Sequence, residues 1–164
     1  MPPYIIMPDQ QALIYGSDSV EATQRFGRQL GQHAEPGSVV ALIGPLGAGK
    51  TQLVKGIAAG LGVEDVRKVS SPTFVIAREH PGRLKLYHVD AYRVSASELS
   101  AIGFDEMCAA EGVVAVEWAD RAADLLPEDH LSIMIEPTGE TVRRLACRAH
   151  GEGSRQLLDR LADA

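Results

Sequence analysis

The stretch that decides the fold runs from residue 39 to residue 51 and reads VVALIGPLGAGKT. Its first five residues are all apolar and follow the turn signal Pro36-Gly37, which is typical of a strand buried on both faces in a parallel sheet. Its last eight residues match the pattern G-x-x-x-x-G-K-[ST] at every specified position. Residues 51–61 then carry an apolar stripe at helical spacing, and Gly62 is placed to end that helix. The sequence therefore predicts a strand, a glycine-rich loop and a helix in direct succession.

The loop has the residue types that a phosphate group requires. Glycines allow the backbone to turn so that successive N–H groups point at one anion, and the next helix adds its positive N-terminal end. Lys50 supplies a cation for the β- and γ-phosphates, and the Thr51 hydroxyl is suited to Mg²⁺. No [NT]-K-x-D segment for reading guanine occurs, which favours ATP over GTP. The predicted nucleotide-binding residues of this segment are Gly44, Leu46, Gly47, Ala48, Gly49, Lys50, Thr51 and Gln52.

Two further strands end in a carboxylate. Residues 84–89 precede Asp90, and residues 113–116 precede Glu117. Ligands of open α/β sheets bind at the carboxyl ends of the strands, so both side chains are expected near the phosphate loop. With Thr51 they form the predicted metal-binding set, and the pattern leaves open which carboxylate touches the metal.

The remaining segments complete an α/β pattern. A first helix is predicted after an N-cap at Ser17 or Asp18, with Glu21 completing a capping box. Residues 96–110 are predicted to be partly helical, with Gly103 dividing them. Residues 131–136 and 141–149 flank a turn signal and predict a late antiparallel hairpin.

We therefore expect one domain over residues 1–164 with the P-loop NTPase fold, a three-layer α/β sandwich. Its sheet should be mostly parallel, with antiparallel additions near the C-terminus. Residues 1–16 are expected to form an irregular arm or an edge strand, and residues 152–164 a short C-terminal helix.

The composition and charge of the chain limit the classes of partner that we expect. The formal net charge is −6 and the pI about 5.3, whereas a protein that grips nucleic acid by its phosphates usually has a basic excess. We therefore expect no DNA partner, and contact with RNA only through another protein. No apolar run approaches the length needed to cross a bilayer, and the N-terminus lacks the pattern of a signal peptide. A cytoplasmic location without membrane contact is the resulting expectation.

Several motifs now coincide in one order: the phosphate loop 44–51, then SPTF at 71–74, HVDAYR at 88–93 and EW at 117–118. Together they closely resemble the TsaE family, the ATPases of bacterial tRNA threonylcarbamoyladenosine biosynthesis. The phosphate loop is shared with many NTPases, whereas the second and third motifs, in this order, are far more specific. The resemblance spans residues 23–118.

The resemblance implies a role for individual residues. Lys50 and Thr51 would contact phosphates and magnesium, and Thr73 corresponds to a threonine that senses the γ-phosphate and the metal. Asp90 matches an acidic position that acts on magnesium directly or through water. Glu117 matches a carboxylate important for hydrolysis. Trp118 would lie beside the nucleotide.

The resemblance also implies a reaction and partners. The family acts with the TsaD and TsaB proteins, which transfer the threonylcarbamoyl group to tRNA. Because no arginine finger has a fixed place in the sequence, we expect weak ATP hydrolysis by the isolated chain, with Arg93 as an internal candidate.

Two rival functions compete with that reading, and direct tRNA binding is a third idea that would need a basic stripe, which the sequence does not reveal. A small-molecule kinase would use Arg143, Arg144 and Arg148 as lid arginines, but their alternation with apolar residues favours a strand with a solvated face. A non-enzymatic module would use the nucleotide only to order itself for a partner. His88 taken alone is interpreted as a structural histidine rather than a catalyst.

Overall fold

The computed structural model describes residues 4–6, 11–72 and 76–164. Its eight-stranded sheet has the order β1-β2-β8-β7-β3-β6-β5-β4. The strands are β1 (Tyr4–Ile6), β2 (Ala12–Ser17), β3 (Val39–Ile43), β4 (Ala77–His80), β5 (Leu86–Asp90), β6 (Val113–Glu117), β7 (Leu131–Pro137) and β8 (Arg143–Ala149). The α-helices are α1 (Val20–His33), α2 (Lys50–Gly60), α3 (Ala96–Ala101), α4 (Phe104–Ala109) and α5 (Glu152–Ala162), and the 3₁₀ segments are η1 (Val66–Lys68) and η2 (Ala119–Leu125).

The centre of the sheet is parallel, as the sequence predicts. Strands β7, β3, β6 and β5 pair in parallel, and the β7–β8 hairpin adds the expected antiparallel pairing. Antiparallel pairing also extends to parts of the chain where it was not expected: β4 borders β5, and β2 and β1 continue the sheet beyond β8. Within residues 1–16, β1 therefore lies at the edge of the sheet while most of β2 lies inside it.

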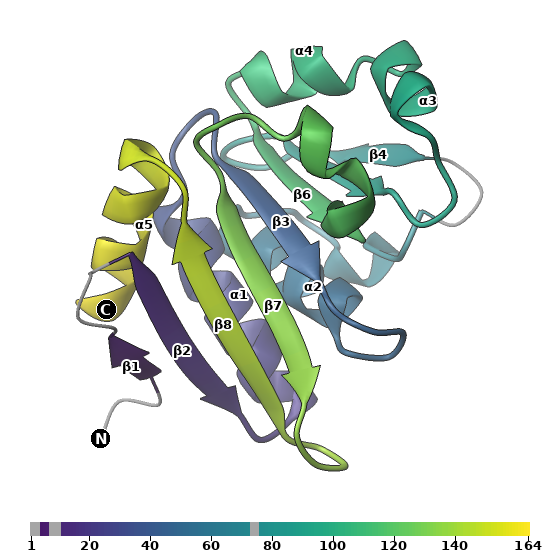
Figure 1. Cartoon of the computed structure of the whole chain (residues 1–164). Coiled ribbons are helices and arrows are strands. Elements are labelled where there is room, and N and C mark those ends of the chain that lie inside the picture. The colour runs from purple at the N-terminus through teal and green to yellow at the C-terminus, as the bar shows by residue number, and fades with distance from the viewer. Residues whose placement is uncertain (1–3, 7–10, 73–75) are drawn as a thin grey trace.

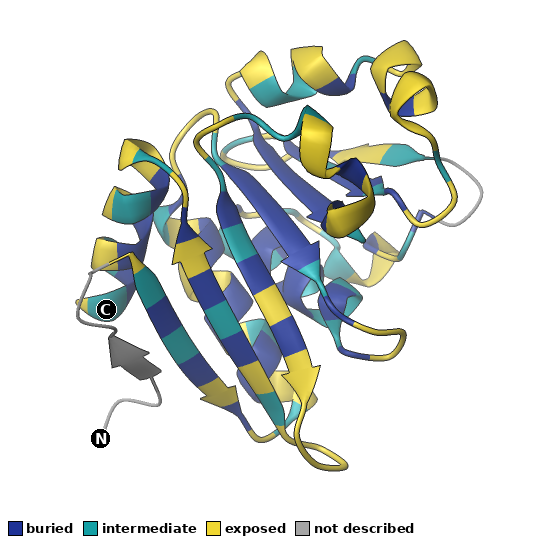
Figure 2. Ribbon diagram, viewed as in Figure 1, coloured by how far each residue is buried: buried dark blue, intermediate teal, exposed yellow. Residues whose placement is uncertain are grey.

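The helices form two layers around the sheet (Figure 1). Helices α1, α2 and α5 pack on one face, where Phe26, Ile57 and Leu158 join the larger of two apolar cores. Helices α3 and α4 and the η2 segment cover the other face around β5 and β6. The α/β/α sandwich of a P-loop protein is thus confirmed. Figure 2 shows exposed and half-buried positions along β2, β8 and β7, where no helix covers the second face.

Local signals explain most element boundaries. Gly103 has φ 88° and separates α3 from α4, as expected. The predicted N-cap of the first helix is wrong: Ser19, not Ser17 or Asp18, accepts the hydrogen bond from the Ala22 amide. The Ser17 hydroxyl is instead buried, 2.7 Å from that of Thr23. Within the described residues, no helix combines the length and apolar character that crossing a bilayer requires.

Candidate functional site

The glycine-rich loop joins β3 to α2 through positions that other residues fit poorly. Gly47 and Gly49 adopt φ angles of 79° and 108°, in the left-handed region that favours glycine. A Cβ atom at Gly44 would lie 2.7 Å from the Ile135 carbonyl oxygen, so β7 leaves no room for a side chain there. The loop that the sequence predicts is therefore held by its backbone, directly before the N-terminus of α2.

Lys50 is folded over this loop. Its side chain is only 5% exposed, and Nζ donates to the carbonyl oxygens of Gly44 (2.7 Å) and Pro45 (2.9 Å). Nζ also lies 3.9 Å from the centre of the Trp118 ring. Burial lowers the pKa of the Lys50 ammonium, and the carboxylates of Glu117, Asp120 and Asp90 partly offset this effect. A buried cation is therefore held against the backbone of the loop.

Glu117 links the loop to the adjacent strand. It ends β6, which pairs directly with β3, and its side chain is almost fully buried. The Thr51 hydroxyl donates to Oε1 of Glu117 at 2.8 Å, and the ring atom Nε2 of His88 lies 2.5 Å from Oε2. A carboxylate only accepts hydrogen bonds, so His88 donates from Nε2 when Glu117 is ionised. Thr51, Glu117 and His88 thus form one connected chain of side chains.

Asp90 occupies the next strand and has other partners. It pairs with Glu117 in the parallel register of β5 and β6. Its Oδ2 accepts from the Ser71 hydroxyl and its Oδ1 from the Tyr92 amide, both at 2.9 Å. Asp90 therefore connects the SPTF segment to the turn after β5, whereas Glu117 is the carboxylate that contacts the phosphate loop.

Trp118 adopts a backbone conformation that a tryptophan rarely takes. Its φ is 57°, which costs of order 1–3 kcal/mol and is found mainly at functional sites. The turn places its ring beside Lys50 and 4.7 Å from the Tyr92 ring, with the Arg121 guanidinium 5.6 Å away. Arg121 also donates to the Tyr92 carbonyl oxygen at 2.9 Å. Trp118, the aromatic residue predicted to lie beside the nucleotide, thus packs against the Lys50 ammonium.

Arg143 is a residue of this site that the sequence analysis missed. Its Nε donates to the Ala48 carbonyl oxygen at 3.0 Å, and its Nη2 lies 3.5 Å from the Gly47 oxygen. The expectation of a purely solvated face was therefore wrong for Arg143, although Arg144 does pair with exposed Glu136. The contact joins residues 95 positions apart, and no local pattern in the sequence indicates it.

The other predicted residues occupy varied positions. Leu46 is 86% exposed at the tip of the loop, and Gln52 accepts a hydrogen bond from Gln24 at 2.8 Å. Thr73 lies outside the described residues. Beside the loop, a cavity of about 490 Å³ is lined by Gly49 and Gln52, the start of α1 and the turn before Arg143. The described members of the predicted set therefore gather at the carboxyl ends of the parallel strands, next to an open cavity.

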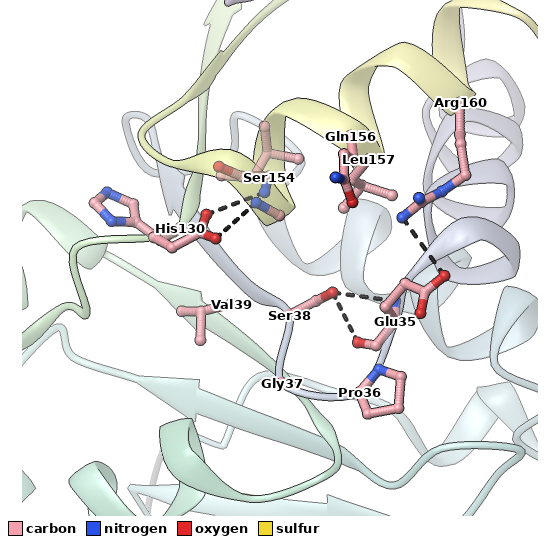
Figure 3. Close-up of a pocket in the computed structure, with 13 residues that line it drawn as sticks. Glu35, Pro36, Gly37, Ser38, Val39, His130, Ser154, Gln156, Leu157 and Arg160 are labelled. Atoms are coloured by element: carbon pink, nitrogen blue, oxygen red, sulfur yellow. Dashed lines mark hydrogen bonds and ion pairs between the residues drawn. The ribbon is translucent and has the colours of Figure 1, made fainter.

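A second cavity, of about 280 Å³, lies at the opposite ends of β3 and β7 (Figure 3). Its polar groups are largely used in the fold, because the Asp129 carboxylate accepts from the Gly153 and Ser154 amides at the start of α5. Arg160 reaches Glu35 at 3.9 Å across the cavity. None of the predicted site residues lines it, so we assign the functional site to the phosphate loop.

Comparisons with known proteins agree on one family. The sequence model of the family "Threonylcarbamoyl adenosine biosynthesis protein TsaE" matches residues 17–145. The tRNA threonylcarbamoyladenosine biosynthesis protein TsaE of Bacillus subtilis (strain 168) is 40% identical over 143 residues, 87% of this chain and 89% of that protein. The protein of the same name from Treponema pallidum (strain Nichols) is 41% identical over 130 residues, 79% and 95% of the two chains. The crystal structure of Bacillus subtilis YdiB has a TM-score of 0.79 at 33% identity and covers 93% of this chain and 95% of its own.

Proposed function

This chain belongs to the TsaE family of tRNA threonylcarbamoyladenosine biosynthesis, and on that premise we propose that it is a magnesium-dependent ATPase serving this modification. The observation that carries the proposal is the 2.8 Å contact between the Thr51 hydroxyl and the buried carboxylate of Glu117, at the start of α2. In nucleotide-hydrolysing P-loop proteins, a loop hydroxyl and an acidic residue at a strand end together hold the metal of the nucleotide.

The donors present fit magnesium. Mg²⁺ prefers hard oxygen ligands and is usually held by one or two side chains together with phosphate and water. The Thr51 hydroxyl and the Glu117 carboxylate supply such oxygens. We propose that Asp90 acts through water, because it ends β5, which is one strand further from β3 and the phosphate loop than β6. Bound there, the metal would neutralise charge that develops on the phosphates. The described residues contain no cluster of three or more His, Cys, Asp or Glu side chains that could hold a metal without the nucleotide.

Different residues of the chain have different roles in this reaction. The backbone N–H groups of residues 44–51 bind the phosphates, and Lys50 leaves its carbonyl partners to meet the β- and γ-oxygens. Glu117 has two oxygens for its two roles: Oε1, which accepts from Thr51, would meet the metal, and Oε2, which is held by His88, would orient the attacking water. The cavity beside Gly49 and Gln52 is of a size to hold the nucleoside.

Hydrolysis by the isolated chain should be slow. Arg93 and Arg121 both lie against the Tyr92 ring, and Arg143 is bound to the loop backbone, so none is aimed at the phosphate site as a free arginine. An arginine supplied by a partner can raise the rate of phosphoryl transfer by about 10³–10⁵. We propose TsaD and TsaB as the partners, with tRNA contacted through them.

Binding and hydrolysis are tested together on purified wild type, Glu117→Gln and the exposed control Glu136→Gln. Saturating Mg²⁺ and ATP, at about a hundred times the dissociation constant, should stabilise the wild type by ~2.7 kcal/mol. Phosphate release should be slow in wild type and in the control, and lost in Glu117→Gln. The absence of any thermal shift, turnover of tens per second by the isolated chain, or full activity of Glu117→Gln would contradict the proposal.

A further inference from the structure

A groove of about 390 Å³ is lined by residues of α1, α2 and η1. Helices α1 and α2 lie side by side behind the sheet in Figure 1. Four basic side chains line the groove: Arg25 and Arg28 from α1, Lys55 from α2 and Arg67 from η1. Glu21 is the one acidic residue among its lining residues. A concentration of positive charge thus stands on a protein whose formal net charge is −6.

Three of these basic side chains have no counter-ion among the residues that the structure describes. Within the described residues, no ion pair or side-chain hydrogen bond involves Arg25, Arg28 or Lys55. Of the four, Arg67 is the one with an ion pair among the described residues: its Nε donates to Oδ1 of Asp65 at 2.9 Å and its Nη2 to Oδ2 at 3.2 Å. Arg25 and Arg28 are exposed and Lys55 is half-buried. The fold therefore does not use these charges, and they remain available to an anionic partner.

The floor of the groove is apolar and closely packed. Gly56, Ala59 and Val66 form it. A Cβ atom at Gly56 would lie 2.3 Å from the Gln24 carbonyl oxygen, because the two helices approach through glycines. The floor therefore belongs to a firm two-helix unit, and its small residues leave space for an apolar side chain from outside.

We propose that this groove binds an acidic segment of a partner protein, whose carboxylates pair with Arg25, Arg28 and Lys55 while an apolar side chain fills the floor. Arginine binds carboxylates through paired, charge-assisted hydrogen bonds. An RNA backbone fits less well, because a net charge of −6 repels a long polyanion and an apolar floor contributes nothing to phosphate binding. The short groove matches a peptide segment that carries both kinds of side chain.

The groove shares helix α2 with the phosphate loop. Lys55 follows Thr51 by four residues, about one helical turn. Gln24, which also lines the groove, donates to Gln52 at 2.8 Å. A segment bound in the groove therefore lies one turn from the proposed nucleotide site. The inference goes beyond the ATPase proposal and does not depend on it, because the groove residues are distinct from the phosphate-binding ones.

The test is an NMR titration of the ¹⁵N-labelled full chain, which detects weak binding and locates it. The probe is a 12-residue peptide that alternates Glu-Glu with Leu, and a peptide with Gln in place of Glu is its control. A 12-nucleotide single-stranded RNA tests the rival polyanion. The test variant is Arg28→Glu/Lys55→Glu. The control variant, Arg78→Glu/Arg148→Glu, makes the same change of charge at exposed positions of β4 and β8.

The acidic peptide should shift amide signals of residues 21–28, 52–59 and 66–67, and Arg28→Glu/Lys55→Glu should weaken binding at least tenfold. The Arg78→Glu/Arg148→Glu variant should bind as wild type does, and the Gln peptide should cause no shifts. No shift at millimolar acidic peptide, shifts scattered over the surface, or stronger binding of RNA at these residues would overturn the inference. ATP titration of the same samples tests the nucleotide site separately, so a failure of the groove proposal can be told apart from a failure of the ATPase proposal.

Discussion

Atom Nε2 of His88 lies 2.5 Å from the Glu117 carboxylate oxygen Oε2, and neither side chain has appreciable contact with solvent. The other oxygen of the same carboxylate accepts from Thr51. Glu117 is therefore held from both sides, by His88 on β5 and by Thr51 in the first turn of α2. The buried Nδ1 of His88 has no hydrogen-bond partner within the described residues, so the interaction with Glu117 is the polar contact that fixes the ring.

Replacing His88 should affect turnover more than nucleotide binding. His88→Leu removes the donor to Glu117 and should lower kcat about tenfold or more, with little change in KM for ATP. His88→Gln keeps a side-chain N–H near the same place and should restore most of the rate. Steady-state ATPase kinetics distinguish the two variants. Equal loss in both, or a change confined to KM, would show that His88 does not position Glu117.

Replacing Arg143 should weaken ATP binding. Its guanidinium holds the carbonyl oxygens of Ala48 and Gly47, and Arg143→Ala removes a contact worth ~1 kcal/mol, or about fivefold in the dissociation constant. Arg144→Ala is the matched control, because the Arg144 guanidinium pairs with exposed Glu136 on β7 and not with the loop. Calorimetric titration with Mg²⁺ and ATP measures both. Identical affinities for ATP in the two variants would mean that ATP binding does not depend on the contact between Arg143 and the loop.

Adding one methyl group between α1 and α2 should destabilise the fold. The new Cβ of Gly56→Ala would meet the Gln24 oxygen at 2.3 Å, and such overpacking typically costs about 1–3 kcal/mol. The higher helix propensity of alanine, worth ~1 kcal/mol, opposes this effect. In Gly139→Ala the new Cβ would lie 3.4 Å from its nearest neighbour, the Cβ of Val142, so stability should change little. Urea unfolding measures the free energy of unfolding of both variants. A Gly56→Ala protein as stable as wild type would argue against the close contact between α1 and α2.

Stability should fall as the pH drops below about 6.5. Burial lowers the pKa of His80 and of His150, and neighbouring positive groups add to both shifts. A histidine with a lowered pKa in the folded state stabilises the protein fully above its unfolded pKa of about 6.5, and this contribution is lost as the pH falls toward the folded value. Unfolding free energies at pH 7.5 and 5.5 measure the effect. The double variant His80→Gln/His150→Gln should show a smaller difference between these pH values, and an unchanged difference would contradict the assignment.

The parts of the site that are continuous in sequence could be predicted from it. The apolar run 39–43, the glycines of the loop and the stripe on α2 act locally, so their order alone indicates strand, loop and helix. Glu117 and Asp90 could be placed at one edge because parallel strands end together. Their different roles could not, since these depend on β6 rather than β5 being the neighbour of β3.

Contacts between distant segments could not be predicted. Arg143 has an ordinary place in an alternating strand, and only the fold brings it to Ala48. His88 is one histidine among five, and its register opposite β6 decides that it meets Glu117. The misplaced N-cap has a similar cause: Ser17 is a good cap by type, but the pairing of β2 with β8 extends through Ser17 and leaves Ser19 to begin the helix.

The central claim is that an ATP-binding phosphate loop in this chain serves tRNA modification. Its most direct test is nucleoside mass spectrometry of tRNA from source cells depleted of the protein and then supplied with wild type, Lys50→Ala or Glu136→Gln. Threonylcarbamoyladenosine should fall on depletion and return with wild type and with Glu136→Gln, but not with Lys50→Ala. An unchanged level after depletion, or full restoration by Lys50→Ala, would contradict the account.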